Sequence, residues 1–330
     1  MGAATTALQS VGNSRQVRLA VLVAILLFGV ALAFPRFLTP RNLAASFDDT
    51  AILILLALGQ MLVIVTRGID LSTAATVAFC GMCAALLNQA MPSAGVVLPV
   101  TVAIVTGAAL GGLNGVLVWQ LKIPPIVATL GTMAIIRGAV YGLSRGTWVT
   151  SNGMSAPFQA AVRYPVFGLT TLSWLAILGV VALAFMLRFS ALGRRFYLTG
   201  NNPVAAATIG INVGRTQAIA YLISGALGGL CGYLWVARFA VAYTDVALGF
   251  ELQVIAACVI GGVAIGGGLG TVAGVLLGCL FLGIIKNALP LVGISPFWQQ
   301  TVSGLVIVTA AVMSARDRST VRQVLERLPS

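Results

Sequence analysis

Residues 191–217 read ALGRRFYLTGNNPVAAATIGINVGRTQ and form a polar window between two long apolar segments. The window is too polar to cross a bilayer and too short to make a soluble domain. Asn202 is suited to cap a helix, and Pro203 suits the first helical position. A short helix is expected over Val204–Ile209, ended by Gly210. Between two spans, such a segment is either an ordinary connecting loop or a protruding helix on which a partner protein docks.

The composition around this window indicates a membrane protein. Hydrophobic residues make up 59% of the 330 residues and charged residues only 8%, whereas soluble domains carry roughly 25% charged residues. The mean hydropathy is +1.04. We therefore predict an all-α polytopic membrane protein with about ten transmembrane helices of ~20 residues each. The net charge of +12 is dispersed along the borders of apolar segments, which favours the lipid bilayer as its partner and argues against nucleic acid.

The predicted organisation is one membrane domain between two tails. Residues 1–16 and 315–330 are the tails, and residues 17–314 are the membrane domain, with 191–217 as its main internal loop. The predicted spans are 17–34, 50–66, 71–89, 95–121, 126–143, 170–189, 218–236, 254–264, 271–285 and 297–313. The span at 254–264 is short, and short helices at bilayer depth occur where they are buried in protein or line a cavity. Segments 2–5 and 7–10 are comparable in length, so an internal repeat is possible.

An even number of spans places both termini on one side, and the cations indicate which side. If the termini are cytoplasmic, twelve Lys and Arg residues lie inside and six lie outside. The six outside are Arg36, Arg41, Arg145, Arg163, Arg238 and Lys286. By the positive-inside rule both termini, and with them the window 191–217, should be cytoplasmic.

The sequence argues against an enzyme. It contains no histidine and no G-x-x-x-x-G-K-[ST] loop, and its five cysteines fall in apolar segments. Cys80 and Cys83 form a C-x-x-C pair that lacks the second pair or histidines of a zinc site. We therefore assign no catalytic residue, no metal and no cofactor to this chain.

Several polar residues lie at or inside the spans. Gly68 permits a break, and Asp70 could cap the next helix and pair with Arg67. Thr129 and Thr132 lie on one face of a helix that starts at Pro125, although hydroxyls in spans usually bond to their own helix carbonyls. Small residues Gly107, Gly111, Gly112 and Gly115 recur at helical spacing, as they do where helices pack closely. A charge inside a span is costly, so Arg137 should lie near the outer end of its span or bond to carbonyls.

Five stretches, in this order along the chain, carry a resemblance to a known family. They are LGQMLVIVTRGIDLS (58–72), PPIVATLGT (124–132), GRRFYLTGNNPVAAATIGIN (193–212), ELQVIAACVIGG (251–262) and SPFWQQ (295–300). The chain resembles the ribose-type ABC sugar permeases, within the branched-chain amino acid and monosaccharide permease family, from about Pro35 to Met313. It departs from the family pattern after Ser72, where Thr73 and Ala74 follow in place of a valine and a glycine.

The resemblance implies a bacterial inner-membrane permease that works by alternating access. Two ATP-binding subunits would bind the ATP and Mg, an external sugar-binding protein would deliver a neutral monosaccharide, and a second copy or paralogue would complete the pathway. The residues implied to couple to the ATP-binding subunit are Arg194, Arg195, Gly200, Asn201, Asn202, Pro203, Ala205, Ala206, Gly210, Ile211 and Asn212. The pathway candidates are Gln60, Asp70, Ser72, Thr129, Thr132, Gln253, Phe297 and Gln299.

Three alternatives stay open at this point. The first is a branched-chain amino acid permease, which would need a site for a zwitterion. The second is an importer of an autoinducer-type furanone. The third is an ion-coupled secondary transporter, which would need a mid-span acid, and the sequence shows acids only at span ends.

Overall fold

The chain is a bundle of long helices, seen in a computed structural model that describes residues 15–295, 298, 300–301, 304–305 and 308. Eight helices among the described residues are long and apolar enough to cross a membrane. They are α2 (Arg15–Ala33), α3 (Pro40–Val65), α4 (Thr73–Ala90), α5 (Val97–Trp119), α6 (Pro125–Ser144), α8 (Thr171–Phe189), α11 (Val213–Phe239) and α13 (Val272–Ala288). The prediction of an all-α polytopic membrane protein is confirmed.

Shorter elements connect these helices. The α-helices among them are α7 (Ala156–Arg163), α9 (Ala191–Asn201), α10 (Pro203–Thr208) and α12 (Phe250–Ile260). The 3-10 turns are η1 (Pro35–Leu38), η2 (Pro92–Ala94), η3 (Ser151–Gly153) and η4 (Leu289–Val292). The strands, paired antiparallel as β1 with β4 and β2 with β3, are β1 (Val149–Thr150), β2 (Pro165–Val166), β3 (Leu169–Thr170) and β4 (Val241–Ala242).

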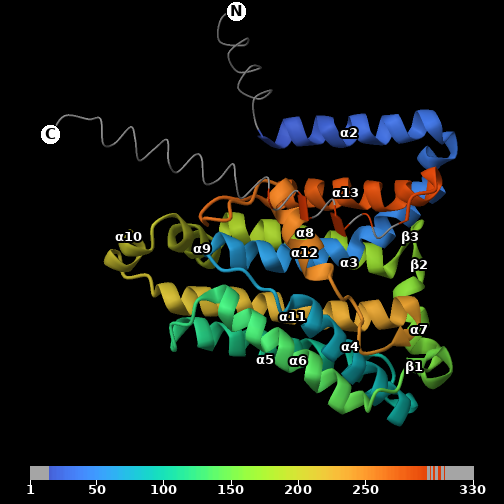
Figure 1. Cartoon of the computed structure of the whole chain (residues 1–330), viewed down its shortest axis with the longest axis horizontal. Coiled ribbons are helices and arrows are strands. Elements are labelled where there is room, and N and C mark those ends of the chain that lie inside the picture. Colours follow the sequence, from blue (N-terminus) through green and yellow to red (C-terminus); the bar gives the residue numbers. More distant parts are fainter. Residues whose placement is uncertain (1–14, 296–297, 299, 302–303, 306–307, 309–330) are drawn as a thin grey trace, which may run out of the picture.

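The helices are stacked with α3 at the centre. In Figure 1, α2 lies at one edge, followed by α13, then α3 with α8 and α12, then α11, and finally α4, α5 and α6. Of the 18 most apolar consecutive residues of α3, 94% are buried inside the protein, whereas only 11% of the corresponding residues of α2 are buried. Helix α3 is therefore the core of the bundle, and α2 is a peripheral helix whose apolar surface suits lipid.

Helices α5 and α11 pack closely against each other. Gly107 and Gly111 on α5 face Gly225 on α11, and a Cβ at Gly111 would lie 2.2 Å from the carbonyl oxygen of Tyr221. Gly112, one residue further along, would place its Cβ no nearer than 3.8 Å from any heavy atom outside its own helix turn. The predicted small-residue face is therefore a helix–helix seam, since backbones this close leave room only for hydrogen.

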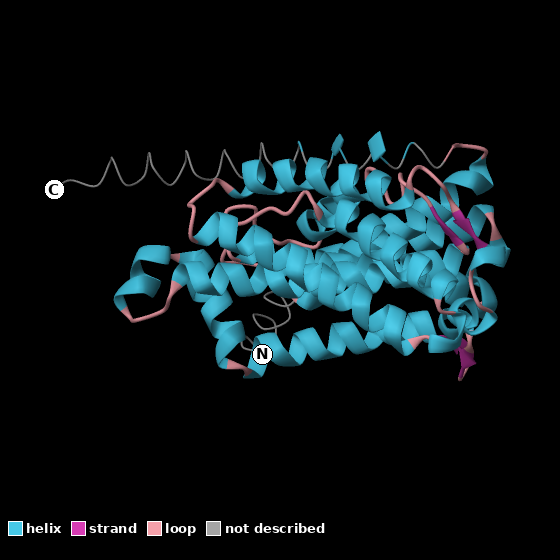
Figure 2. Cartoon of the chain, turned by 90° about the horizontal axis from the view of Figure 1, so that it is seen from below, coloured by secondary structure: helices cyan, strands magenta, loops and turns pink. Residues whose placement is uncertain are grey.

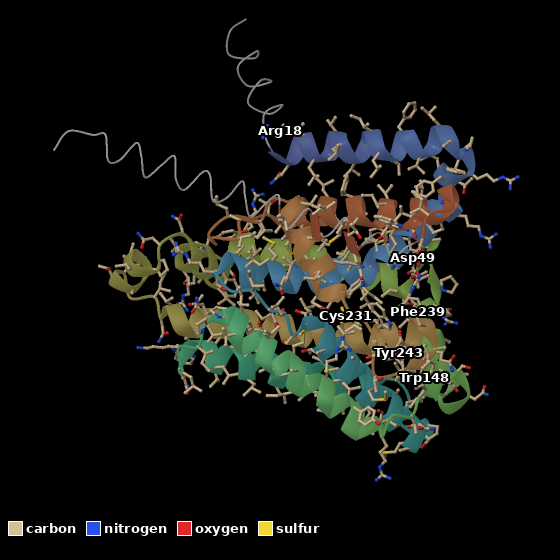
Figure 3. All side chains as sticks on the ribbon, viewed as in Figure 1. Arg18, Asp49, Trp148, Cys231, Phe239 and Tyr243 are labelled. Carbon is tan, nitrogen blue, oxygen red and sulfur yellow. The ribbon has the colours of Figure 1, made fainter. Side chains whose placement is uncertain are left out.

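The two ends of the bundle have different structures. The beginning of α2, α9 and α10 lie at one end, and η1, α7 and the two short ribbons lie at the other (Figures 1 and 3). We call these the coupling end and the ribbon end. At the ribbon end Arg238 forms ion pairs with Asp48 and Asp49, and Asp48 also accepts a hydrogen bond of 3.1 Å from the Ser173 hydroxyl. This cluster joins the third turn of α3 to α8 and to the end of α11.

The segment between α11 and α13 differs from the sequence prediction. The span predicted at 254–264 is α12, which begins earlier and has 11 residues. It is about 16 Å long and cannot cross a hydrocarbon core of about 30 Å. The loop between α11 and α12, residues 240–249, is partly buried, with Val246 and Ala247 buried and Leu248 62% exposed. The tenth predicted span, 297–313, lies largely outside the described residues.

Arg137 of α6 is bonded to this loop. Its guanidinium donates hydrogen bonds to the carbonyl oxygens of Thr244, at 3.1 Å, and Val246, at 2.9 Å. Buried backbone carbonyls need hydrogen-bond donors, and a charge on a spanning helix needs partners as well. The expectation that Arg137 bonds to carbonyls is confirmed, and the cation and the loop satisfy each other.

Candidate coupling site

The polar window contains two helices where the sequence predicted one. Ser190 caps α9 by accepting a hydrogen bond of 3.0 Å from the amide of Gly193. Asn202 caps α10 by accepting hydrogen bonds of 3.1 Å from the amides of Val204 and Ala205. The predicted cap and the proline start at Pro203 are therefore confirmed, whereas α9 was missed, although Ser190 before an amphipathic run is a usual helix-start signal.

Helix α10 projects beyond the ends of the bundle helices in both views (Figures 1 and 2). Gly210 ends it with a φ of +83°, and Asn212 then caps α11 through the Arg215 amide. Val204 and Ile209 are 76% and 67% exposed, whereas Ala206 between them is 2% exposed. The helix thus has a buried anchor and an exposed apolar tip, and we call α10 the knob.

Gly200 fixes the base of this knob to two distant parts of the chain. A Cβ there would lie 1.7 Å from the carbonyl oxygen of Val65 and 2.5 Å from the amide nitrogen of Gly268. That same amide donates a hydrogen bond of 2.9 Å to the Val65 carbonyl. The end of α9, the end of α3 and the glycine-rich loop 261–271 therefore meet at one point, where any side chain larger than hydrogen would separate them.

Arg67 holds the same junction from the side of α3. Its Nε and Nη2 atoms donate to the carbonyl oxygens of Gly200, at 2.7 Å, and Asn201, at 3.0 Å. The predicted pairing of Arg67 with Asp70 is therefore wrong. The last carbonyls of a helix attract a cation because they are short of hydrogen-bond donors, and α9 ends at these two residues.

Two more hydrogen bonds close the junction. Gln217 of α11 donates to the Thr66 carbonyl at 2.9 Å, and the Tyr197 phenol of α9 donates to the Gly270 carbonyl at 2.8 Å. Burial raises the pKa of Tyr197 above its ordinary value, so the phenol stays a donor at neutral pH. The coupling end is thus held by side chain to backbone bonds among four separate segments.

The remaining predicted coupling residues lie on the surface around this junction. Arg194 is exposed, and its guanidinium lies 3.5 Å from the Phe189 carbonyl oxygen. Arg195 lines a cavity of about 300 Å³ together with Ile211, Asn212 and Arg215. Ala205 is exposed beside the tip of α10. These residues surround the knob with positive charge, which suits an acidic partner surface.

Four of the polar groups at the spans form one hydrogen-bonded chain that the sequence did not assemble. Thr132 of α6 donates to the Asn114 amide oxygen of α5 at 2.7 Å. The Asn114 nitrogen donates to the Ser72 hydroxyl at 2.8 Å, and that hydroxyl donates to the Asp70 carboxylate at 2.6 Å. All four residues are buried, at 5% exposure or less. We call this set the polar chain.

Asn114 was missed by the sequence analysis. It is the single amide in an otherwise apolar helix, and that isolation was the available signal. Asp70, expected to cap α4, instead accepts hydrogen bonds from the amide and the hydroxyl of Ser72, the residue just before the helix. These two hydrogen bonds close the turn at residues 70–72, before α4 begins.

The other pathway candidates are placed as follows. Gln60 is fully buried, and its amide pairs with the backbone of Asp70 at 3.1 and 3.2 Å when oriented to satisfy both atoms. Thr129 bonds both to its own helix, at Pro125, and to the Ile69 carbonyl at 3.1 Å. Gln253 lies on α12 at 9% exposure, and Phe297 and Gln299 lie outside the described residues. A role in the pathway stays a prediction for all of them.

Comparison with known proteins identifies the family of this chain. Residues 42–311 match the family model described as the branched-chain amino acid transport system / permease component. The chain belongs to this permease family. It is an ABC-transporter permease, a multi-pass protein of the inner membrane, as the resemblance implied.

Individual relatives match over nearly the full length. The autoinducer 2 import system permease protein LsrC of Escherichia coli O9:H4 (strain HS) is 35% identical over 323 residues, covering 97% of this chain and 92% of the relative. The protein of the same name from Salmonella typhi is 34% identical, covering 97% and 91%. No solved structure gives a significant match. The shared length indicates that the whole membrane domain, and not only the polar window, follows the family.

Proposed function

We propose that this permease is the translocation subunit of an importer for a neutral, sugar-like solute, driven by separate ATP-binding subunits that dock on α10. The observation that carries the proposal is the knob itself. It presents Val204 and Ile209 to a partner, while Gly200 and Arg67 tie its base to α3 and to the loop before α13. A partner that moves the knob would therefore move the bundle.

Two charged groups of the bundle, Arg137 and Asp70, support a neutral solute. The Arg137 guanidinium is bonded to two carbonyls, and the Asp70 carboxylate is bonded to Ser72. Both groups already have partners and neither is presented as a counter-charge for an ion or a zwitterion. The uncharged pathway candidates carry hydroxyl and amide groups, which are the groups that recognise a polyhydroxyl solute. This favours a monosaccharide over a branched-chain amino acid.

A second candidate substrate is an autoinducer-type furanone. The names of the LsrC relatives, which describe autoinducer 2 import, favour it. The candidates are distinguished by measuring uptake into vesicles that contain the permease and an ATP-binding subunit, with an external binding protein added. Labelled pentose, hexose, deoxyhexose, autoinducer 2 and leucine are supplied in turn. Uptake of leucine alone would contradict the sugar-like assignment, and uptake driven by an ion gradient without ATP would contradict the ABC mechanism.

We further propose the assembly that such a mechanism needs. Two permease copies, or one with a paralogue, would enclose the pathway, since the candidate polar groups of one chain are buried against its own helices. ATP and Mg would bind to the partner subunits, and this chain would carry no cofactor. Alternating access would follow from ATP-driven closure of the partners, with the knob as the point of contact.

The docking prediction is tested with exposed residues, because Gly200 and Ala206 are buried and their variants would disturb the junction. Val204→Asp combined with Ile209→Asp should weaken binding of the ATP-binding subunit at least about thirtyfold, since an apolar anchor in an interface contributes about 2 kcal/mol or more. The affinity is measured with purified permease in nanodiscs. The control is Phe167→Asp, a 94% exposed residue at the ribbon end. Unchanged affinity in the double variant would show that α10 is not the docking knob.

A further inference from the structure

We propose that the turn between α3 and α4, residues 66–72, transmits movement of the coupling end to α5 and α6. The inference rests on the proposed function, because it concerns how a docked partner drives the bundle. We call residues 66–72 the transmission turn. Within this segment, the residues that contact α9 and α11 lie only a few positions along the chain from the residues of the polar chain.

One side of the transmission turn is bonded to the coupling end. The Arg67 guanidinium reaches the last two carbonyls of α9, and Thr66 accepts a hydrogen bond from Gln217 at the beginning of α11. Val65, directly before the turn, accepts the Gly268 amide beside Gly200. Displacement of α9 or α11 relative to α3 must therefore break the bonds of Arg67 or Thr66, or carry the turn with it.

The other side is bonded to α5 and α6. Ser72 connects Asp70 to Asn114 of α5, and Asn114 connects in turn to Thr132 of α6. A second bond runs from the Thr129 hydroxyl of α6 to the Ile69 carbonyl at 3.1 Å. Two independent hydrogen-bonded connections therefore join a seven-residue turn to α6, and one of them passes through α5.

The transmission turn is too tightly held to absorb the movement by bending. Arg67 has a φ of +69°, a left-handed conformation that non-glycine residues adopt at a cost and that its two carbonyl contacts maintain. Gly68 leaves no room for a Cβ, which would lie 2.6 Å from the Tyr221 hydroxyl. Asp70 and Ser72 are 3% and 0% exposed. Hydrogen bonds in such a water-excluded place are costly to break, so displacement of the turn is passed on to the helices bonded to it.

A competing route runs through α11, which follows the polar window directly and packs along α5. The two routes differ in what they need. The α11 route depends on the glycine seam, whereas the transmission turn depends on the hydroxyls of Ser72 and Thr132 in one connection and of Thr129 in the other. Removing those hydroxyls leaves the seam, the knob and the Arg67 contacts in place. The variants Ser72→Ala and Thr132→Val, and all variants compared with them below, are therefore made in a Thr129→Val background, which removes the second connection and separates the routes.

The first readout is the number of solute molecules imported per ATP hydrolysed, in vesicles with the ATP-binding subunit and with the solute identified as described above. In Thr132→Val and in Ser72→Ala this ratio should fall between about 5- and 150-fold, the usual range of coupling between two sites. ATP hydrolysis and partner affinity should stay at the wild-type level. Thr132→Ser, which keeps the hydroxyl, should restore the ratio. Thr101→Val is the matched control, because the Thr101 hydroxyl on α5 is exposed and bonds to its own helix.

The second readout follows the movement itself without transport. Cys83→Ala first removes the partly exposed native thiol. Spin labels are then attached at Thr208→Cys on the knob and at Ile135→Cys on α6, both of which are exposed. The distance between the two labels follows the two ends of the proposed route. ATP with Mg should change this distance in the wild-type background and in Thr101→Val. The change should be lost in Thr132→Val.

The outcomes separate the two proposals. Thr132→Val and Ser72→Ala chains that keep the wild-type ratio and the wild-type distance change would overturn the transmission turn alone and assign the movement to α11. A wild-type chain that neither binds the ATP-binding subunit nor responds to ATP would overturn the proposed function, and this inference with it. Should Ser72→Ala fail to fold, Thr132→Val decides, since it removes one hydroxyl while keeping the shape of the side chain.

Discussion

Replacing Gly111 by alanine should destabilise the permease by about 3 kcal/mol, the upper part of the range for overpacked interiors. The added Cβ would lie 2.2 Å from the Tyr221 carbonyl oxygen, which is backbone and cannot turn aside. Helices α5 and α11 would have to separate along the whole seam formed with Gly107 and Gly225. The thermal midpoint of unfolding in detergent micelles, together with the yield of monodisperse protein, measures the effect.

Gly112→Ala is the matched control for this prediction. It makes the same chemical change one residue away on the same helix, where the nearest atom to a new Cβ is 3.8 Å distant. Alanine is favoured over glycine in a helix by about 1 kcal/mol, so this variant should be neutral or slightly more stable. Equal midpoints for the two variants would mean that the seam is not the close contact described above.

Replacing Arg238 by methionine should cost about 3–5 kcal/mol, as expected when one partner of a largely buried ion pair is removed. Its guanidinium pairs with Asp48 and Asp49, and the Arg238 and Asp48 side chains are only 17% and 12% exposed. The cluster lies at the ribbon end near Asp49 and Phe239 (Figure 3), where α3, α8 and α11 meet. Without the cation two neighbouring carboxylates would repel each other. The same thermal midpoint measures the loss.

Two further variants test the reason for that loss. Arg41→Met removes an exposed cation at the same end and should change the midpoint little, because exposed charges contribute little to stability. The double variant Asp48→Leu with Arg238→Met should be more stable than Arg238→Met alone, since it leaves no unpaired charge at the most buried position. A double variant that is less stable than either single variant would show that packing, rather than charge pairing, holds this end together.

The long spans and the knob could be predicted from the sequence because their signals are local. Eighteen or more apolar residues predict a span wherever the rest of the chain lies. Asn202, Pro203 and Gly210 predict a short helix from their own backbone preferences, and the structure places α10 there. The spacing of Gly107 and Gly111 predicts a face for close packing, since helical periodicity alone puts them on one side.

The parts that depend on distant segments could not be predicted in this way. The loop 240–249 is held by Arg137, whose bonds reach more than 100 residues away along the chain. Arg67 has an acid three residues away in sequence, yet it bonds to carbonyls 133 and 134 residues away. Asn114 gives no local signal for its partners Ser72 and Thr132. Backbone preference and hydropathy act within a few residues, whereas the partner of a buried polar group is decided by which segments the packed helices bring together.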